Sequence, residues 1–138
     1  MKNYGDEDTS FLAAGGAEGL YDLVESFYDY METIPEAQKI RNMHPTDLEV
    51  TRDKLRVFLS GWLGGPREYS SKYGPIRIPA AHAHLKIEEA ERDAWLLCMQ
   101  KAVADQSKWA DSFKEYFMIQ IAVPAERVRL ACLPNAES

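Results

Sequence analysis

The chain has 138 residues, 46% of them hydrophobic and 28% charged, which suits one soluble globular domain with a sizeable core. Its formal net charge of −6 disfavours non-specific binding to nucleic-acid phosphates. The N-terminus is acidic without a signal-peptide pattern, and no apolar run approaches the ~20 residues that cross a bilayer, so we expect a cytoplasmic protein without a nucleic-acid or membrane partner.

The first elements are a short helix and a long amphipathic one. Residues 9–14 predict a short apolar helix that ends at Gly15 and Gly16, and Gly19 follows three residues later. The spacing of these glycines matches no nucleotide-binding fingerprint, so we interpret them as a tight turn that lets two helices approach closely. Over residues 17–32, the apolar side chains that recur at helical spacing are Leu20, Leu23, Val24, Phe27, Tyr28 and Met31.

Two prolines mark the boundaries of the next pair of helices. Pro35 favours the first turn of a short helix. The pair His44 and Pro45 ends it, because a residue before proline is pushed out of helical geometry. Asp47 is placed to cap a helix over residues 48–63. The side chains that form its apolar face are Leu48, Leu55, Phe58, Leu59 and Trp62, with Thr51 on the same stripe.

The segment that follows this helix contains two of the three histidines. Prolines interrupt residues 64–79, so the segment cannot be one long helix. His82 and His84 come next, two residues apart. Taken alone, a histidine such as His82 is more often a polar residue of the core or the surface than a metal ligand. A non-haem metal site built from both histidines and a carboxylate is short of ligands.

Two further helices complete an all-α domain over residues 1–138. Residues 87–104 predict one helix, and Ser107 is placed to cap a last one that Pro124 should kink or interrupt. The inward side chains we expect are Trp95, Leu96, Cys98, Met99, Ala102 and Val103, then Trp109, Phe113, Phe117, Ile121 and Val128. No segment alternates as a strand does, no linker divides the chain, and residues 1–8 and 134–138 read as flexible tails.

The two cysteines point to a reducing compartment. Cys98 and Cys132 are far apart in the chain and show no Cys-x-x-Cys pattern. This arrangement argues against a disulfide framework and against a structural zinc site. We therefore expect both thiols to be free.

Several motifs, taken in order, resemble those of a group II truncated haemoglobin, a two-over-two globin. The motifs are Gly15-Gly16-x-x-Gly19, Phe27-Tyr28, His44-Pro45 before Asp47-Leu48, Lys54-Leu55-x-x-Phe58-Leu59, Leu63-Gly64-Gly65-Pro66 and Glu91-Arg92-Asp93-Ala94-Trp95-Leu96-x-Cys98-Met99. The last block and the Gly-Gly-Pro run are the most specific, whereas the final helix matches only in general character. The resemblance implies a helical sandwich around haem b (iron protoporphyrin IX).

The resemblance also implies a role for individual residues. His82 would be the proximal haem-iron ligand, and Trp95, 13 residues later, would enter the distal pocket. Tyr28 would be a distal hydrogen-bond donor, and His44 would lie at the aromatic position after the short third helix. Alone, Tyr28 and Trp95 would be read as core aromatics. The remaining side chains expected around the haem are Phe27, Thr51, Leu55, Phe58, Leu85, Ile87 and Met99.

The stretch around the proximal histidine departs from the group. Many members carry arginines at two positions there that pair with the haem propionates, and here Pro79 and Ala81 stand in their place. Arg77 and Lys86 are the nearest cations that could substitute. The local sequence pattern hardly favours either His82 or His84 as the iron ligand. The spacing to Trp95 selects His82, and His84 falls where the group usually has proline.

Two functions follow from the resemblance. Ferrous haem shifts charge onto dioxygen, and the O–H of Tyr28, the N–H of Trp95 and a His44 nitrogen can donate hydrogen bonds to it. Such bonds contribute about 1.5–3 kcal/mol each and would slow ligand escape. The first function is reversible capture of O2, CO, NO and similar ligands by a monomer or weak dimer. The alternative is a redox enzyme, a nitric oxide dioxygenase or peroxidase-like, that needs an external reductase because the chain has no flavin or nicotinamide motif.

Overall fold

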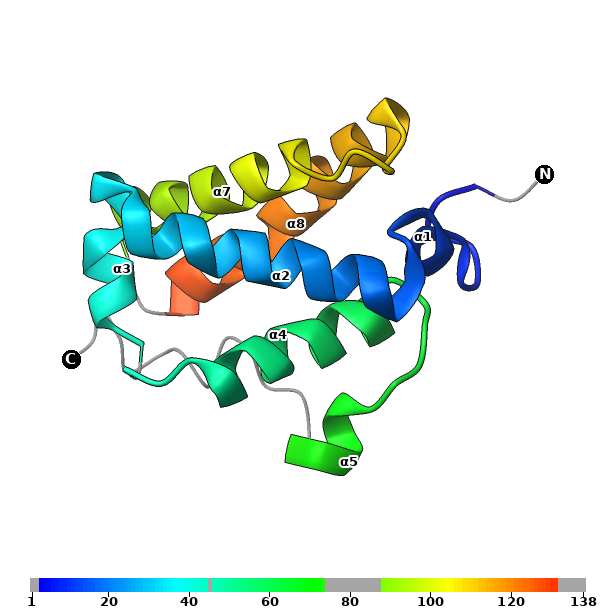
Figure 1. The fold of residues 1–138 in the computed structure, drawn as a ribbon, viewed down its shortest axis with the longest axis horizontal. Coiled ribbons are helices and arrows are strands. Elements are labelled where there is room, and N and C mark those ends of the chain that lie inside the picture. Colours follow the sequence, from blue (N-terminus) through cyan, green and yellow to red (C-terminus); the bar gives the residue numbers. More distant parts are fainter. Residues whose placement is uncertain (1–2, 45, 74–87, 132–138) are drawn as a thin grey trace.

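The computed structural model describes residues 3–44, 46–73 and 88–131, and all the regular structure in these ranges is helical (Figure 1). The α-helices are α1 Thr9–Ala13, α2 Gly16–Thr33, α3 Gln38–Asn42, α4 Glu49–Trp62, α5 Tyr69–Tyr73, α7 Glu89–Ala104 and α8 Asp111–Ala131. A 3-10 turn, Pro35–Ala37, leads into α3 and begins with the proline that the sequence placed at a helix start. The all-α prediction is confirmed.

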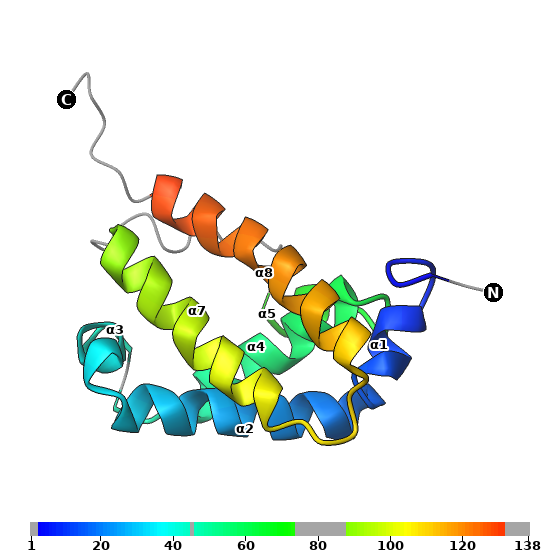
Figure 2. The same cartoon turned by 90° about the horizontal axis from the view of Figure 1, so that it is seen from above.

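Four long helices pack as two pairs. α2 packs against α4 on one side and against α7 on the other, and α7 packs against α8. Seen from above, α7 and α8 lie side by side and run at an angle to α2 (Figure 2). Trp62 at the end of α4 contacts Phe117 of α8, with ring centroids 5.9 Å apart, so the two pairs share one core.

The core is built on the apolar stripe of α2. All six side chains that helical spacing assigned to this stripe are buried, none with more than 3% of its surface exposed. Phe113, Phe117 and Ile121 of α8 are buried at successive turns of their own helix. Burial of these faces is what holds the helices together, since isolated helices of such length are marginal in water.

Glycine allows a close approach at the start of α2. A Cβ atom on Gly19 would lie 1.8 Å from the carbonyl oxygen of Ala14, which no side chain can tolerate. The same oxygen accepts a hydrogen bond of 2.9 Å from the indole N–H of Trp109. The glycine cluster is therefore a structural turn that brings α1, α2 and the connection before α8 into contact, as its spacing indicated.

The boundaries of the last helix differ from those expected. α8 begins at Asp111, so Ser107 does not cap it and Trp109 lies in the preceding turn, where its N–H bonds to the carbonyl of Gln106 at 3.1 Å. Pro124 does not interrupt the helix either, which continues to Ala131. Proline removes one backbone donor, but Ile121 in the turn before it is buried, and Glu126 in the turn after it pairs with Arg92 of α7 at 3.0 Å.

The N-terminal turns of α4 and α7 are capped by carboxylates. Asp47, the expected cap, lies one position before the observed N-cap Leu48 and accepts a hydrogen bond of 2.9 Å from the N–H of Glu49. Glu88 and Glu91 form a capping box at the start of α7. Both helix starts therefore have partners for backbone N–H groups that the helix itself leaves unpaired.

The first described residues pack on the last helix. Tyr4 lies in the stretch that the sequence suggested as a flexible tail, and its ring centroid is 5.1 Å from that of Phe113. Its hydroxyl is 2.8 Å from the hydroxyl of Ser112. Within the described ranges, no helix has the length and apolar character needed to span a membrane.

Candidate functional site

Two of the side chains expected on the distal side of a haem meet at one buried phenylalanine, and a third contacts one of the two. The Phe27 ring centroid lies 4.9 Å from that of Tyr28 and 5.0 Å from that of Trp95, both in edge-to-face geometry. The Tyr28 ring also lies 6.0 Å from the imidazole of His44. The structure thus brings together residues from α2, from α7 and from the end of the α3 segment.

Trp95 is positioned by the first turn of α7. Glu91 lies four residues before it and is buried, with 6% of its surface exposed. Its carboxylate accepts a hydrogen bond of 2.9 Å from the N–H of Glu88 and lies 3.5 Å from the Nζ of Lys39 on α3. This contact joins the start of α7 to α3, and the helix then carries Trp95 one turn further to Phe27.

His44 is held in one orientation by the helix turn before it. Its Nδ1 lies 2.7 Å from the carbonyl oxygen of Ile40. A carbonyl only accepts, so Nδ1 must carry the proton and donate it. A neutral imidazole then presents an acceptor at Nε2. His44 would therefore donate to a ligand from Nε2 only in the imidazolium form.

Two buried donors fit a pocket that receives an acceptor. Tyr28 is 3% exposed, and its hydroxyl has no hydrogen-bond partner within the described residues. Burial raises the pKa of Tyr28 well above its ordinary value, and the positive charge of Arg52 opposes this rise. Trp95 is half-buried and its indole N–H likewise has no described partner, whereas that of Trp109 is bonded. Neither donor atom is among the fully buried side-chain atoms without a partner in the described residues, which are the Nε atoms of Arg52 and Arg56, so both groups can donate to a bound ligand.

α4 and α7 supply the apolar wall expected beside these donors. Thr51, Leu55 and Phe58 follow one another by four and three residues, so they share one face of α4, and each is half-buried. The ring of Phe58 stacks on that of Trp62, with centroids 6.1 Å apart. Met99 lies one turn after Trp95 on α7 and has no exposed surface.

The proximal side lies outside the described residues. This applies to all the residues that the resemblance places there: Arg77, His82, His84, Leu85, Lys86 and Ile87. Their roles stay predictions. Among the residues that are described, no group of three His, Cys, Asp or Glu side chains could hold a metal ion.

The model of the bacterial-like globin family matches residues 9–123. The chain belongs to this family. Membership implies that the protein binds haem, and the described aromatic cluster fits that group. The matched range includes α1 to α7 and more than half of α8.

Known relatives narrow the family to its two-over-two members. This globin is 35% identical over 88 residues to the Group 2 truncated hemoglobin YjbI of Bacillus subtilis, a match that spans 64% of each chain and so just under two thirds of that relative. A solved group II 2-on-2 hemoglobin from Agrobacterium tumefaciens shares 33% identity and a TM-score of 0.82, with 88% of this chain and 93% of that one covered. A cold-adapted truncated hemoglobin from Pseudoalteromonas haloplanktis shares 30% identity and a TM-score of 0.82, with 87% and 96% covered. This globin is a group II truncated haemoglobin.

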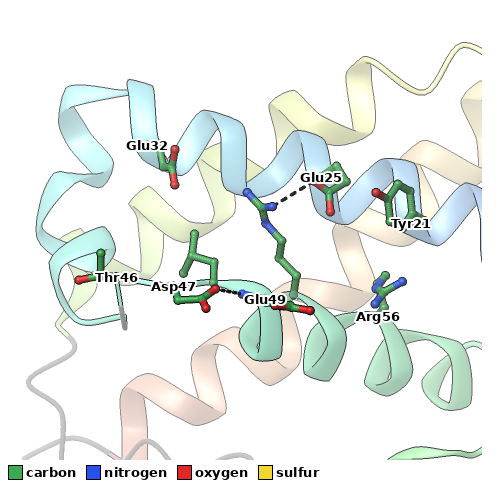
Figure 3. A pocket seen from close by; sticks show the side chains of 9 residues that line it. Tyr21, Glu25, Glu32, Thr46, Asp47, Glu49 and Arg56 are labelled. Carbon is green, nitrogen blue, oxygen red and sulfur yellow. Dashed lines mark hydrogen bonds and ion pairs between the residues drawn. The ribbon is translucent and has the colours of Figure 1, made fainter.

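One feature of the site was missed by reading the sequence. A pocket of about 560 Å³ lies between α2 and α4 and is lined mostly by charged side chains (Figure 3). Arg52 belongs to its lining, and its Nη1 lies 3.3 Å from Glu25. The available signal was the pair Arg52 and Arg56, which stand four residues apart and so share one face of the helix.

Proposed function

We propose that this globin reversibly captures dioxygen and other diatomic ligands at haem b, with Tyr28 and Trp95 as distal hydrogen-bond donors. The observation that carries the proposal is the meeting of both side chains at Phe27, each with a polar hydrogen that no described residue accepts. An electron-rich ligand is the partner that such donors suit.

The haem supplies, when bound, a ferrous iron that coordinates the ligand. His82 would hold the group on the proximal side, and Arg77 or Lys86 would pair with its propionates. On the distal side, Phe27 keeps the two donors apart and excludes water from the space between them, because it is fully buried. Thr51 and Leu55 would face the ligand from α4.

The strength of the two donors favours retention of the ligand over rapid release. A hydrogen bond to a charged or strongly polarised acceptor contributes about 1.5–3 kcal/mol. Two such bonds slow escape by about two orders of magnitude or more, because 1.4 kcal/mol is tenfold. A solved relative from Bacillus subtilis is described as a truncated oxygen-avid haemoglobin, and it shares 29% identity and a TM-score of 0.76 over 86% of this chain and 97% of that one. This description supports slow release.

Visible spectroscopy of the purified protein tests the proposal. We expect a ferrous protein whose spectrum changes on addition of O2 or CO and returns when the gas is removed. A protein that takes up no haem, or whose ferrous form binds neither gas, contradicts the proposal. Recording the same spectrum during addition of nitric oxide and a reductant separates capture from redox turnover. Sustained consumption of both reagents would favour the enzyme alternative.

A further inference from the structure

Arg52 stands on α4 and lines the charged pocket between α2 and α4. Its Nη1 is 3.3 Å from the Oε2 of Glu25, which stands on α2 (Figure 3). Glu25 precedes Tyr28 by three residues, so these two side chains are neighbours on the helix surface. The ion pair therefore holds the guanidinium of Arg52 against α2, about one helical turn from Tyr28.

The charge of Arg52 is only partly compensated. Its side chain is 29% exposed, and its Nε is buried without a hydrogen-bond partner in the described part of the chain. Charges act more strongly through a partly buried environment than through water. In agreement with this geometry, the Arg52 charge is the influence that lowers the pKa of Tyr28 against the larger effect of burial.

We propose that Arg52 is a positioning residue for the distal site: its positive charge, held in place by Glu25, polarises the Tyr28 hydroxyl and strengthens the hydrogen bond that Tyr28 donates to a bound ligand. The inference rests on the proposed function and adds a determinant of ligand selectivity to it. A ligand that gains negative character on binding, such as O2, benefits more than CO, which stays nearly neutral.

The pocket itself does not suit an anionic ligand. Four carboxylates, those of Glu25, Glu32, Asp47 and Glu49, line it together with the two arginines. The role of Arg52 is therefore better assigned to its charge acting on Tyr28, which does not line the pocket, than to a ligand taken from solvent.

Arg56 provides a matched control. It stands one turn after Arg52 on α4 and lines the same pocket. Its Nη2 pairs with Asp53 at 2.8 Å and its guanidinium lies over the ring of Tyr21, at 5.3 Å. Arg56 thus has similar exposure and charge but different partners, so Arg56→Gln removes one positive charge from the pocket and should leave the distal site unchanged.

The experiment compares Arg52→Gln, Arg52→Lys, Glu25→Gln and Arg56→Gln in the haem-loaded protein. The readouts are the O2 dissociation rate and the C–O stretching frequency of the ferrous CO complex, which reports the local electric field. We expect Arg52→Gln to raise the O2 rate about threefold to tenfold and to raise the stretching frequency. Arg52→Lys should restore much of both. Glu25→Gln should shift both readouts in the same direction as Arg52→Gln but by less, because it keeps the positive charge and removes the carboxylate that holds it in place.

A purely structural role for Arg52 predicts a different pattern. It would make Arg52→Lys fail to restore the stretching frequency that Arg52→Gln changes, and this result would overturn the inference. So would unchanged readouts in Arg52→Gln, or an equal effect of Arg52→Gln in a Tyr28→Phe background. Unfolding midpoints of the apoproteins show whether a variant is folded. If Arg52→Gln does not fold, the two readouts of Glu25→Gln supply the test. A wild-type protein that forms no CO complex would overturn the proposed function as well.

Discussion

Phe27 of α2 and Trp95 of α7 meet edge to face, with their ring centroids 5.0 Å apart and their planes at 62°. Tyr28 packs on the same phenylalanine from its own helix, 4.9 Å away. Two polar side chains are therefore held by contact with a ring that has no polar atom. A substitution at Phe27 disturbs both donors, whereas removal of one donor leaves the other in contact with the phenylalanine.

Removing a distal donor should speed the release of dioxygen. We expect Trp95→Phe to raise the O2 dissociation rate by about tenfold or more, because the lost bond is charge-assisted. Tyr28→Phe should raise it as well. Stopped-flow displacement of O2 by CO measures both rates. Unchanged rates in the two single variants and in the double variant would remove the donor model.

Truncation of Phe27 should destabilise the fold itself. The side chain is fully buried, so Phe27→Ala should lower the free energy of unfolding by about 3–5 kcal/mol. Leu12→Ala is the control, since Leu12 is 63% exposed and its removal should change stability by less than about 0.5 kcal/mol. Urea unfolding of the apoproteins gives both values. Equal transition midpoints for the two variants would show that the Phe27 contacts contribute little.

The proximal assignment is tested by two histidine variants. His82→Gly should lose the normal haem spectrum, and imidazole added to the solution should restore it. His84→Ala should keep that spectrum, because residues two apart on a short helix point in well-separated directions and cannot both face the haem. The opposite result, loss with His84→Ala and retention with His82→Gly, would show that the alignment of this segment is wrong.

An ion-pair cluster between α7 and α8 predicts part of the acid response. Hydrogen bonds from Arg129 and Arg92 lower the pKa of Glu126 from 4.5 to about 2. The folded pKa lies below the unfolded one, so the stabilisation is fully present above about pH 4.5 and disappears as the pH falls towards 2. Glu126→Gln should therefore flatten the decline of unfolding midpoint over this range. The exposed Glu115 on the same helix supplies the control, Glu115→Gln, and an equal effect there would contradict the prediction.

Cys98 should resist alkylation in the folded protein. Burial raises the pKa of its thiol to about 11, so the reactive thiolate is scarce at neutral pH. Mass spectrometry after alkylation without reductant should show Cys98 unmodified in buffer and modified in denaturant. The structure describes Cys98 as a free thiol. A stable disulfide between Cys98 and Cys132 in the purified protein would contradict the expectation of a reducing compartment.

Periodicity predicted the helices well where one face is apolar. The stripe of α2 is the clearest case, since all its spaced apolar residues are buried. It failed around Ser107 and Pro124. Trp109 was assigned to the last helix because it is apolar, yet its indole is used to bond the distant Ala14 and its backbone forms a separate turn. Local residue preferences carry no information on such a long-range partner.

The candidate site was predicted in its composition but not in its electrostatics. Family resemblance selected Tyr28, His44 and Trp95, and the structure places them together around Phe27. The tautomer of His44 depends on the position of the Ile40 carbonyl, which only the folded helix turn defines. The proximity of Arg52 to Tyr28 likewise depends on how α4 packs against α2, and the order of residues along α4 does not reveal it.

The hydrogen bond from Trp109 to Ala14 links positions 95 residues apart. A growing polypeptide can form it only after both partners have left the ribosome. At a typical synthesis rate of 5–20 residues per second, this delay is roughly 5 to 20 s. The Ala14 carbonyl and the glycine contact beside it lack their last neighbour during that interval, so the N-terminal end of α2 reaches its native packing only when synthesis is nearly complete.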